Sequence, residues 1–313
     1  MNIDELITRI KKDQDNIKES INSDEGMARL KQVAAEYSGE FKLIWSHDTL
    51  EEIKNRPKKI SHNTGLKELD DLTGGLREQQ LVGIGAQSGH GKTAFGLWLL
   101  KQYEQLNPVL LPLEQSSEEL IEQRLSNNQF IPNYLAPKRH AAHVNPDWIE
   151  ERIVEAIAKH NSKLIMLDHM GYIEAGDDYR RENEHLRIEK KLQSLKHLAI
   201  KWDVVIVILI QLQQMEEQET PQLRDLKGSS AIRQECDKIL FLWRNNAKKG
   251  KARAYDKKVL VSLQKNRQTG LNGNIGTQFD FKTGNYEITE DTMEWAENLE
   301  SGAKDKLSAD DAF

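Results

Sequence analysis

The sequence predicts an α/β protein with a mostly parallel central sheet flanked by helices, plus a small helical segment at the N-terminus. Three observations predict this fold. Apolar strands alternate with helical segments from residue 64 onward. The run Val204–Ile210 is apolar on both faces, as a strand covered by helices on both sides requires. The stretch Leu81–Leu100 passes from an apolar strand through a loop of small residues into a helix.

The stretch Leu81–Leu100 also has the layout of a phosphate-binding loop. Backbone N–H groups of the loop would point at phosphates, Lys92 would reach the terminal phosphates, and the Thr93 hydroxyl would bind Mg²⁺. The strict pattern begins with Gly where this chain has Ala86, which costs little if φ is negative there. The alternative is an ordinary helix-entry turn. We predict a nucleoside triphosphate site made by Ala86, Gln87, Ser88, Gly89, His90, Gly91, Lys92 and Thr93.

Composition excludes several classes of protein. A length of 313 residues suggests about two domains, and one Cys excludes a disulfide framework and a Cys-rich zinc site. The N-terminus is charged rather than an apolar leader, and the run Val204–Ile210 is too short to span a bilayer. We expect a soluble, cytoplasmic protein without membrane contact.

The net charge of −6 argues neither for nor against nucleic acid, because it is concentrated at one end. Residues 286–313 hold nine Asp/Glu and two Lys, which leaves 42 basic against 41 acidic residues elsewhere. Any phosphate-binding surface must therefore be local.

The chain divides into four predicted parts. Residues 1–37 form a helical segment, because Asn2–Ile21 and Met27–Tyr37 each carry apolar residues at helical spacing. They could cover their own core or dock on another protein. Residues 38–63 are a linker with a short helix at Thr49–Asn55, which would pack on its own chain or on a neighbouring subunit. Residues 64–288 are the ATPase domain, and residues 289–313 are an acidic tail.

The ATPase domain is predicted to alternate strands and helices. The expected strands are Leu81–Ile84, Val109–Leu113, Leu164–Leu167, Val204–Ile210, Lys238–Trp243 and Val259–Gln264, with a hairpin around Gln278–Ile288. The expected helices are Thr93–Gln105, Ser117–Asn127, Asp147–His160 and Glu182–Lys201.

Polar side chains follow three of these strands at the edge where parallel sheets bind ligands. Asp168 could hold the Mg²⁺ water shell, Glu114 could polarise the water that attacks the γ-phosphate, and Gln211 could sense that phosphate. The alternatives are an ordinary turn Asp, a first-turn Glu of the next helix and a solvated strand end. Lys265 and Arg267 leave the next strand on one side. Such a cation pair suggests an arginine finger, although surface Lys and Arg are common.

Seven blocks of the sequence together resemble the RecA-like ATPase domain of hexameric replicative helicases, the DnaB-like group and the phage and mitochondrial (Twinkle-like) primase-helicases. The blocks read TGLKELDDLTGGL, AQSGHGKT, PLEQSSEEL, LIMLDHMGYI, VVIVILIQLQQ, DLKGSSAIRQECD and LQKNRQTG. The resemblance covers Thr64–Ile288. DnaB-like proteins often carry Ala at the position of Ala86, and the pair Asp168-His169 is closer to the phage branch.

The resemblance implies an ATP- and Mg²⁺-dependent, ring-forming DNA helicase, in a hexamer that translocates on single-stranded DNA. It implies that Lys92, Thr93 and Asp168 bind phosphate and metal. It further implies that Glu114 is the catalytic base and Gln211 the γ-phosphate sensor. A phage-encoded helicase would act in the host cytoplasm.

Other positions follow from the same resemblance. Lys265 and Arg267 would reach the ATP of the adjacent subunit, and Gln234 would couple the ATP state to the DNA-binding loops. Two loops, Glu174–Asn183 and Gln213–Gly228, would face single-stranded DNA, although the second also contains acids. The expected DNA contacts are Arg180, Arg181, Arg224, Lys227 and Gly228.

Residues 1–63 lack a zinc-finger primase pattern and are shorter than the N-terminal domain of DnaB, so we expect a helicase that recruits primase separately. The N-terminal helices and the tail, which ends in Asp311-Ala312-Phe313, could dock a polymerase, a primase or a single-strand-binding protein. The tail could equally be a disordered solubilising segment. Two other functions stay open, namely a recombination or annealing ATPase that coats single strands and a regulatory ATPase that does not translocate.

Overall fold

The computed structural model describes residues 44–55, 60–139, 141, 143–174, 183–212, 220–226, 229–244, 246–249, 252–255 and 257–299. The chain forms two compact units, Met1–Lys58 and Lys59–Phe313. In the first unit, α4 (Ser46–Asn55) confirms the short helix predicted at Thr49–Asn55 and begins three residues earlier, and none of its residues is buried. The predicted helices within residues 1–37 lie outside the described residues.

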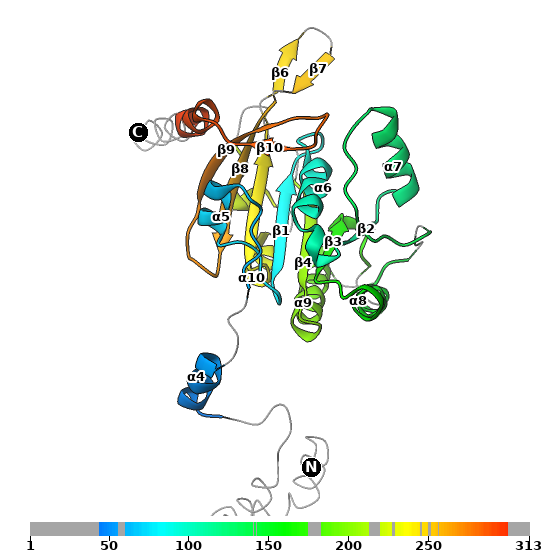
Figure 1. Cartoon of the computed structure of the whole chain (residues 1–313), viewed down its shortest axis with the longest axis vertical. Coiled ribbons are helices and arrows are strands. Elements are labelled where there is room, and N and C mark those ends of the chain that lie inside the picture. The colour runs from blue at the N-terminus through cyan, green and yellow to red at the C-terminus, as the bar shows by residue number, and fades with distance from the viewer. Residues whose placement is uncertain are drawn as a thin grey trace, which may run out of the picture. The chain divides into compact units, whose positions relative to one another are not determined.

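The second unit is built on an eight-stranded sheet with the order β10-β9-β8-β5-β1-β4-β3-β2 (Figure 1). The five strands from β5 to β2 run parallel, and β8, β9 and β10 are antiparallel, so the predicted α/β fold with a mostly parallel sheet is confirmed. The strands are β1 (Leu81–Ala86), β2 (Val109–Pro112), β3 (Leu164–Asp168), β4 (Val205–Gln211), β5 (Lys238–Trp243), β8 (Lys258–Asn266), β9 (Gly273–Phe279) and β10 (Tyr286–Glu287).

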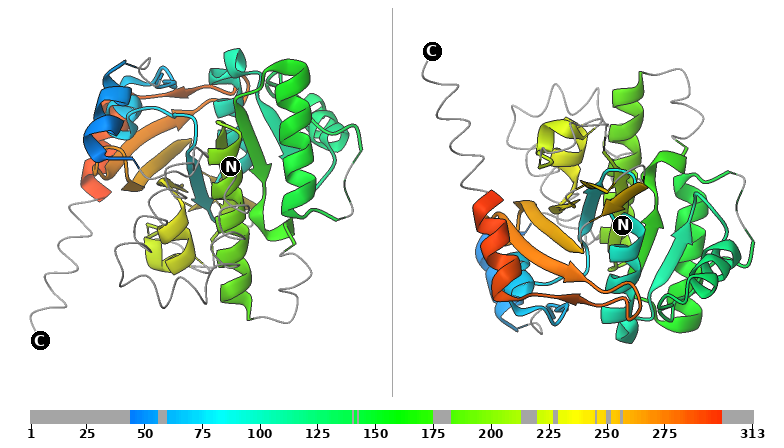
Figure 2. Two further views of the ribbon diagram at one scale, coloured as in Figure 1. Left: turned by 90° about the horizontal axis from the view of Figure 1, so that it is seen from below. Right: turned by 90° about the horizontal axis from the view of Figure 1, so that it is seen from above.

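Helices cover both faces of this sheet (Figure 2). They are α5 (Lys67–Thr73), α6 (Lys92–Gln102), α7 (Ser117–Ser126), α8 (Pro146–His160), α9 (Glu184–Lys201) and α10 (Ser229–Glu235). α8, α9 and α10 pack on one face, whereas α5 and α6 pack on the other. None of the helices in the described part of the chain is both long and apolar enough to cross a membrane.

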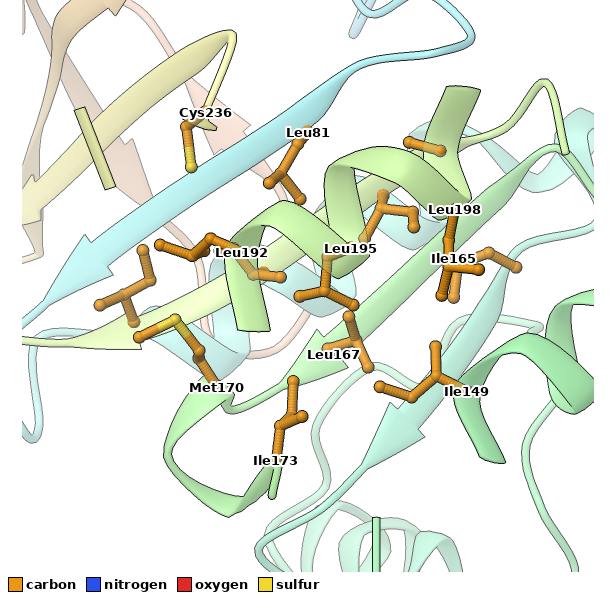
Figure 3. Close-up of a cluster of buried hydrophobic side chains, with 14 of the residues drawn as sticks. Leu81, Ile149, Ile165, Leu167, Met170, Ile173, Leu192, Leu195, Leu198 and Cys236 are labelled. Atoms are coloured by element: carbon orange, nitrogen blue, oxygen red, sulfur yellow. The ribbon is translucent and has the colours of Figure 1, made fainter. Parts of the chain in front are cut away.

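Strand β4 shows why the core has two sides. Its residues alternate, with Ile206 and Ile208 facing the α9 side and Val205 and Val207 facing the α6 side. On the α9 side, Leu192 and Leu195 of the helix lie against the strands (Figure 3). A strand buried on both faces must be apolar at every position, which is the pattern visible in the sequence.

The structure adds elements that the sequence did not predict. The short helices α5 and α10 and the hairpin of β6 (Asn246–Lys249) with β7 (Ala252–Tyr255) were not expected. The ATPase unit also begins before residue 64, because His62 pairs with Leu76.

Residues 290–299, which we placed in the acidic tail, form a helix that packs on the sheet. Thr292 is fully buried, Ala296 packs with Trp243 and Leu260, and the Trp295 ring stacks on Trp243 at 6.2 Å between centroids. The acids of this segment lie on its outer side and hide a narrow buried face from composition.

The amino ends of the parallel strands hold a buried lysine, Lys238, which is the first residue of β5. Its ammonium group donates to the Gly75 carbonyl, to Gln80 Oε1 at 3.2 Å and to Gln268 Oε1 at 3.0 Å. Burial, and to a smaller extent the charge of Arg77, lowers the pKa of Lys238 to about 8, while Asp237 partly opposes both. The three oxygens give the charge the partners that burial requires.

Replacing Gly276 should test how the helix at 290–299 is attached. A Cβ at Gly276 would lie 1.7 Å from the Thr292 carbonyl oxygen, whereas at Gly273 the nearest atom would be 3.4 Å away, on Leu72. We expect Gly276→Ala to lower the free energy of unfolding by about 1–3 kcal/mol or more, as overpacking does. Gly273→Ala, on the same strand, should leave the melting temperature nearly unchanged. Equal melting temperatures for the two variants would contradict this attachment.

The buried Lys238 predicts a pH dependence of stability. Its pKa is about 8 in the folded chain and ~10.4 in an unfolded one, so between these values only the unfolded chain holds the proton. The free energy of unfolding should therefore rise with pH in this window, by up to ~1.4 kcal/mol per pH unit relative to Lys238→Met. Urea unfolding of both proteins from pH 7 to pH 10 measures the difference, and parallel profiles would refute it.

Candidate active site

The predicted phosphate loop lies where β1 meets α6. β1 ends at Ala86 and α6 begins at Lys92, so the strand is two residues longer than predicted. Gly89 and Gly91 have φ of 83° and 92°, which only glycine adopts without strain, and Gly91 is the N-cap of α6. Ala86 sits in the extended strand, so its side chain is tolerated there. The loop thus ends at a helix N-terminus, where backbone N–H groups and the helix dipole favour an anion.

Three of the predicted residues meet beside this loop. The Thr93 hydroxyl donates to Asp168 Oδ2 at 2.8 Å, and Lys92 Nζ lies 3.6 Å from Asp168 Oδ1. The Lys92 and Asp168 side chains are only 12% and 10% exposed. Burial lowers the pKa of Lys92, while the charges of Asp168 and Glu114 act in the opposite direction. The cation and the carboxylate therefore hold each other in place until phosphate arrives.

The same three residues fit a hard divalent cation. Asp168 Oδ1 is buried without a hydrogen-bond partner, which leaves a lone-pair site aimed into the crevice. The Thr93 hydroxyl is the second oxygen, and hydroxyl and carboxylate oxygens are what Mg²⁺ binds, directly or through water.

Glu114 and His169 face each other across the same crevice. Glu114 follows β2, is 59% exposed, and its Oε2 lies 3.8 Å from His169 Nε2. His169 Nδ1 accepts the backbone N–H of Gly171 at 3.0 Å, so a neutral ring carries its proton on Nε2, toward Glu114. Burial and the charge of Lys92 lower the pKa of His169. Glu114 thus has room for a water and a neutral donor beside it.

Gln211 lies at this edge as well. It is the last residue of β4 and pairs with Ala86 in the parallel register, and the next residue, Leu212, donates its N–H to the Ala86 carbonyl at 3.0 Å. The structure therefore brings Lys92, Thr93, Asp168, Glu114 and Gln211 to one edge of the sheet.

Sequence reasoning missed two contacts of the loop. His90 is 2% exposed, and its Nδ1 accepts the backbone N–H of Arg244 at 3.0 Å. Arg244 follows β5, is buried, and its guanidinium lies 5.1 Å from the centre of the Phe281 ring. The rule that identified Glu114 and Gln211, a polar residue directly after a parallel strand, would also have identified Arg244.

Lys265 and Arg267 do not reach this edge. β8 runs antiparallel to β5, so Lys265 pairs with Ile239 at the amino ends of the parallel strands. Lys265 donates to the Arg233 carbonyl and Arg267 to the Gln234 carbonyl, both at the end of α10. The length of β5 separates them from the phosphate loop by roughly 16 Å, more than their side chains span.

Most of the expected DNA contacts cannot be placed. Arg180, Arg181, Lys227 and Gly228 lie outside the described residues. Arg224 is described, with its side chain 73% exposed and its Nε 3.8 Å from Asp225.

A cavity of about 840 Å³ opens beside the active-site edge. Its walls include His169, Gln211 and, on α9, the cations Arg187 and Lys191. Positive side chains therefore border the edge on the side of α9.

Comparisons with known proteins point in one direction. A family model described as "DnaB-like helicase C terminal domain" matches residues 62–148 and 139–287. The replicative DNA helicase DnaB of Treponema pallidum is 28% identical over 220 residues, covering 61% of this chain and 50% of the relative. The DnaB of Geobacillus stearothermophilus is 26% identical over 247 residues, covering 67% and 54%. This chain thus spans about half the length of these relatives.

Solved structures show the same fold. The ATPase domain of a phage helicase superimposes with a TM-score of 0.64 at 24% identity, covering 78% of this chain and 97% of that chain. A DnaB-like replicative helicase, described with its interactions with primase, gives 0.64 at 22% identity, covering 91% and 77%.

Lys92→Met should abolish the phosphate contact without unfolding the protein. Losing charge-assisted hydrogen bonds costs about 1.5–3 kcal/mol, so affinity for a fluorescent ATP analogue should fall roughly 10- to 100-fold. Lys101→Met is the matched control, because Lys101 lies on the same helix and donates to Asn285 instead. Equal affinity of both variants would remove Lys92 from the site.

Proposed function

Because the chain belongs to the family of DnaB-like helicase C-terminal domains, we propose that it is an ATP-driven replicative DNA helicase. In this proposal it forms a ring, translocates on single-stranded DNA and unwinds duplex. The observation that carries the proposal is the family match over residues 62–287, joined to the meeting of Lys92, Thr93 and Asp168 at the phosphate loop.

ATP hydrolysis follows from the active-site edge. The loop N–H groups and Lys92 bind the phosphates, and Thr93 and Asp168 hold the Mg²⁺, which neutralises charge that develops on the phosphates. Glu114 orients the attacking water and accepts its proton, with the His169 Nε2–H beside it. Gln211, next to the start of the loop, contacts the γ-phosphate and reports its presence to the segment that follows β4.

The ring follows from the separation of two charged edges. Lys265 and Arg267 lie at the amino ends of the strands, out of reach of their own phosphate loop. In a head-to-tail assembly the amino edge of one subunit can face the nucleotide of the next. The two cations then stabilise the transition state in the neighbouring subunit, so turnover requires a closed ring, which we take to be a hexamer.

Single-stranded DNA is the proposed track. Contacts from Arg180, Arg181, Arg224, Lys227 and Gly228 would hold the sugar-phosphate backbone, as suits a motor that passes every sequence. Gln234 would link these loops to the ATP state, because its carbonyl accepts the Arg267 guanidinium.

The proposal extends to partners and location. Primase, polymerase or a single-strand-binding protein would dock on the N-terminal helices or on the acidic segment after residue 299, in the cytoplasm, or in the host cytoplasm for a phage-encoded protein. One solved relative is described with its interactions with primase. Pull-down of each candidate by the full chain, compared with a chain ending at residue 299, tests the docking.

Mass photometry with ATP and Mg²⁺, with and without single-stranded DNA, and a forked-duplex unwinding assay test the main proposal together. Rings of about six subunits and ATP-dependent unwinding support it. Open filaments without unwinding would favour a strand-coating recombination ATPase, and ATP turnover indifferent to DNA would favour a regulatory ATPase.

Arg267→Ala should separate binding from turnover. We expect unchanged affinity for ATP and a fall in kcat by about 10³-fold or more, the usual effect of losing an arginine finger. Mixing with Lys92→Ala subunits should restore part of the turnover, because the intact Arg267 of one protein then faces the intact phosphate loop of the other. Loss of ATP binding by Arg267→Ala, without restoration on mixing, would place Arg267 in the site of its own subunit.

A further inference from the structure

Arg267 lies in the turn after β8, between two side chains that point the opposite way. Asn266 is 5% exposed and contacts the end of α5, whereas the Arg267 side chain is 47% exposed and contacts the end of α10. Neighbouring residues of a strand face opposite sides of a sheet. Whatever fixes Asn266 and Gln268 on one face therefore fixes the backbone from which Arg267 extends on the other.

Asn266 uses its whole amide to hold this turn. Its Nδ2 donates to the Thr73 carbonyl at 2.9 Å and to Thr269 Oγ1 at 2.7 Å, and its Oδ1 accepts the Gln268 N–H at 3.0 Å. Thr73 is the last residue of α5, and helix carbonyls in the last turn have no intrahelical partner. Asn266 thus joins the folding of its own turn to the end of a helix nearly two hundred residues earlier in the sequence.

Gln268 makes the second attachment to the same place. Its Nε2 donates to the Gly74 carbonyl at 3.1 Å, and its Oε1 accepts from Lys238 Nζ at 3.0 Å and from Gln80 Nε2 at 3.2 Å. A Cβ at Gly74 would lie 2.7 Å from Gln268 Nε2, so the helix end is open only because this residue is glycine. Four segments meet on one amide.

The attachment on the other face is of a different kind. Arg267 donates to the Gln234 carbonyl, and its Nη1 lies 3.7 Å from Asp237 Oδ1. These contacts are half open to solvent, and exposed pairs are weak. The buried network of Asn266 and Gln268, whose loss would leave carbonyls without partners, is the stronger constraint on the turn.

We propose that Asn266 and Gln268 are positioning residues for Arg267, holding the turn at residues 266–270 on the end of α5 so that the guanidinium can reach the nucleotide of the adjacent subunit. The inference rests on the proposed function, because it gives the turn a task only if Arg267 acts across a subunit boundary. A docked turn makes that reach part of the fold of one subunit, before any neighbour or nucleotide is bound.

The test is a double-mutant cycle on ATP turnover of the full chain. Asn266→Ala is made in the wild-type protein and in Arg267→Ala, and Asn272→Ala, an exposed Asn of the same turn region, is the matched control. We expect Asn266→Ala to lower kcat by roughly 10- to 100-fold, as a displacement of about 1 Å can, with unchanged KM for ATP. In the Arg267→Ala background it should change kcat less than about 2-fold, because the residue it positions is gone.

A second variant guards against a failure to fold. Gln268→Met keeps the length of the side chain and removes its amide, and it should show the same dependence on Arg267. Mixing either variant with Lys92→Ala subunits should restore turnover, since the defect then lies in the cation that one subunit presents and not in its own ATP site.

The outcomes separate the two proposals. Equal losses of kcat in both backgrounds, or an increase in KM without a change in kcat, would overturn the positioning role while leaving the helicase proposal intact. Full turnover by Arg267→Ala itself would overturn both.

Discussion

The central strand β1 has no side chain at two positions of its α9-facing surface, and the geometry of the site depends on that. A Cβ at Gly85 would lie 2.7 Å from the Phe241 ring, and one at Gly83 would lie 3.1 Å from Ile210. Side chains of β4 and β5 fill this space, so β1 can occupy the centre of the sheet in one register only. That register sets Ala86 opposite Gln211 and Leu242. The phosphate loop and the ends of both neighbouring strands therefore arrive at one edge.

The two edges of the sheet carry different charges, and β1 connects them. At the carboxyl edge Lys92 lies against Asp168. At the amino edge Asp237 accepts the Leu81 N–H at 2.8 Å and pairs with Lys196 at 2.6 Å and with Arg267 at 3.7 Å. The strand that ends at the phosphate loop thus begins in the cluster that holds Arg267. A rigid, fully buried strand fixes the separation of the two groups, which is the property that a head-to-tail assembly can use.

The strands were predictable because each is buried on both faces, and a fully buried strand must be a run of apolar residues. Lys238–Trp243 was predicted with its observed bounds, and β4 within one residue. The elements that were missed are short or buried along a narrow stripe. α5 has seven residues, of which Leu69 and Thr73 are buried. The helix at 290–299 buries Thr292 and Ala296 among acids that dominate its composition.

The sequence by itself determined the phosphate loop and the acids and amide that follow the parallel strands. These signals are local, since each consists of a strand and the few residues after it, and parallel strands always end at one edge. Only the tertiary structure decided that Arg244 meets His90, and that Asn266 and Gln268 hold the turn of Arg267 on the end of α5. It also decided that Lys265 and Arg267 lie at the far edge. The reason is physical: the order of the strands and the antiparallel course of β8 depend on pairing between segments distant in the chain. No local pattern records which strand a segment will lie beside.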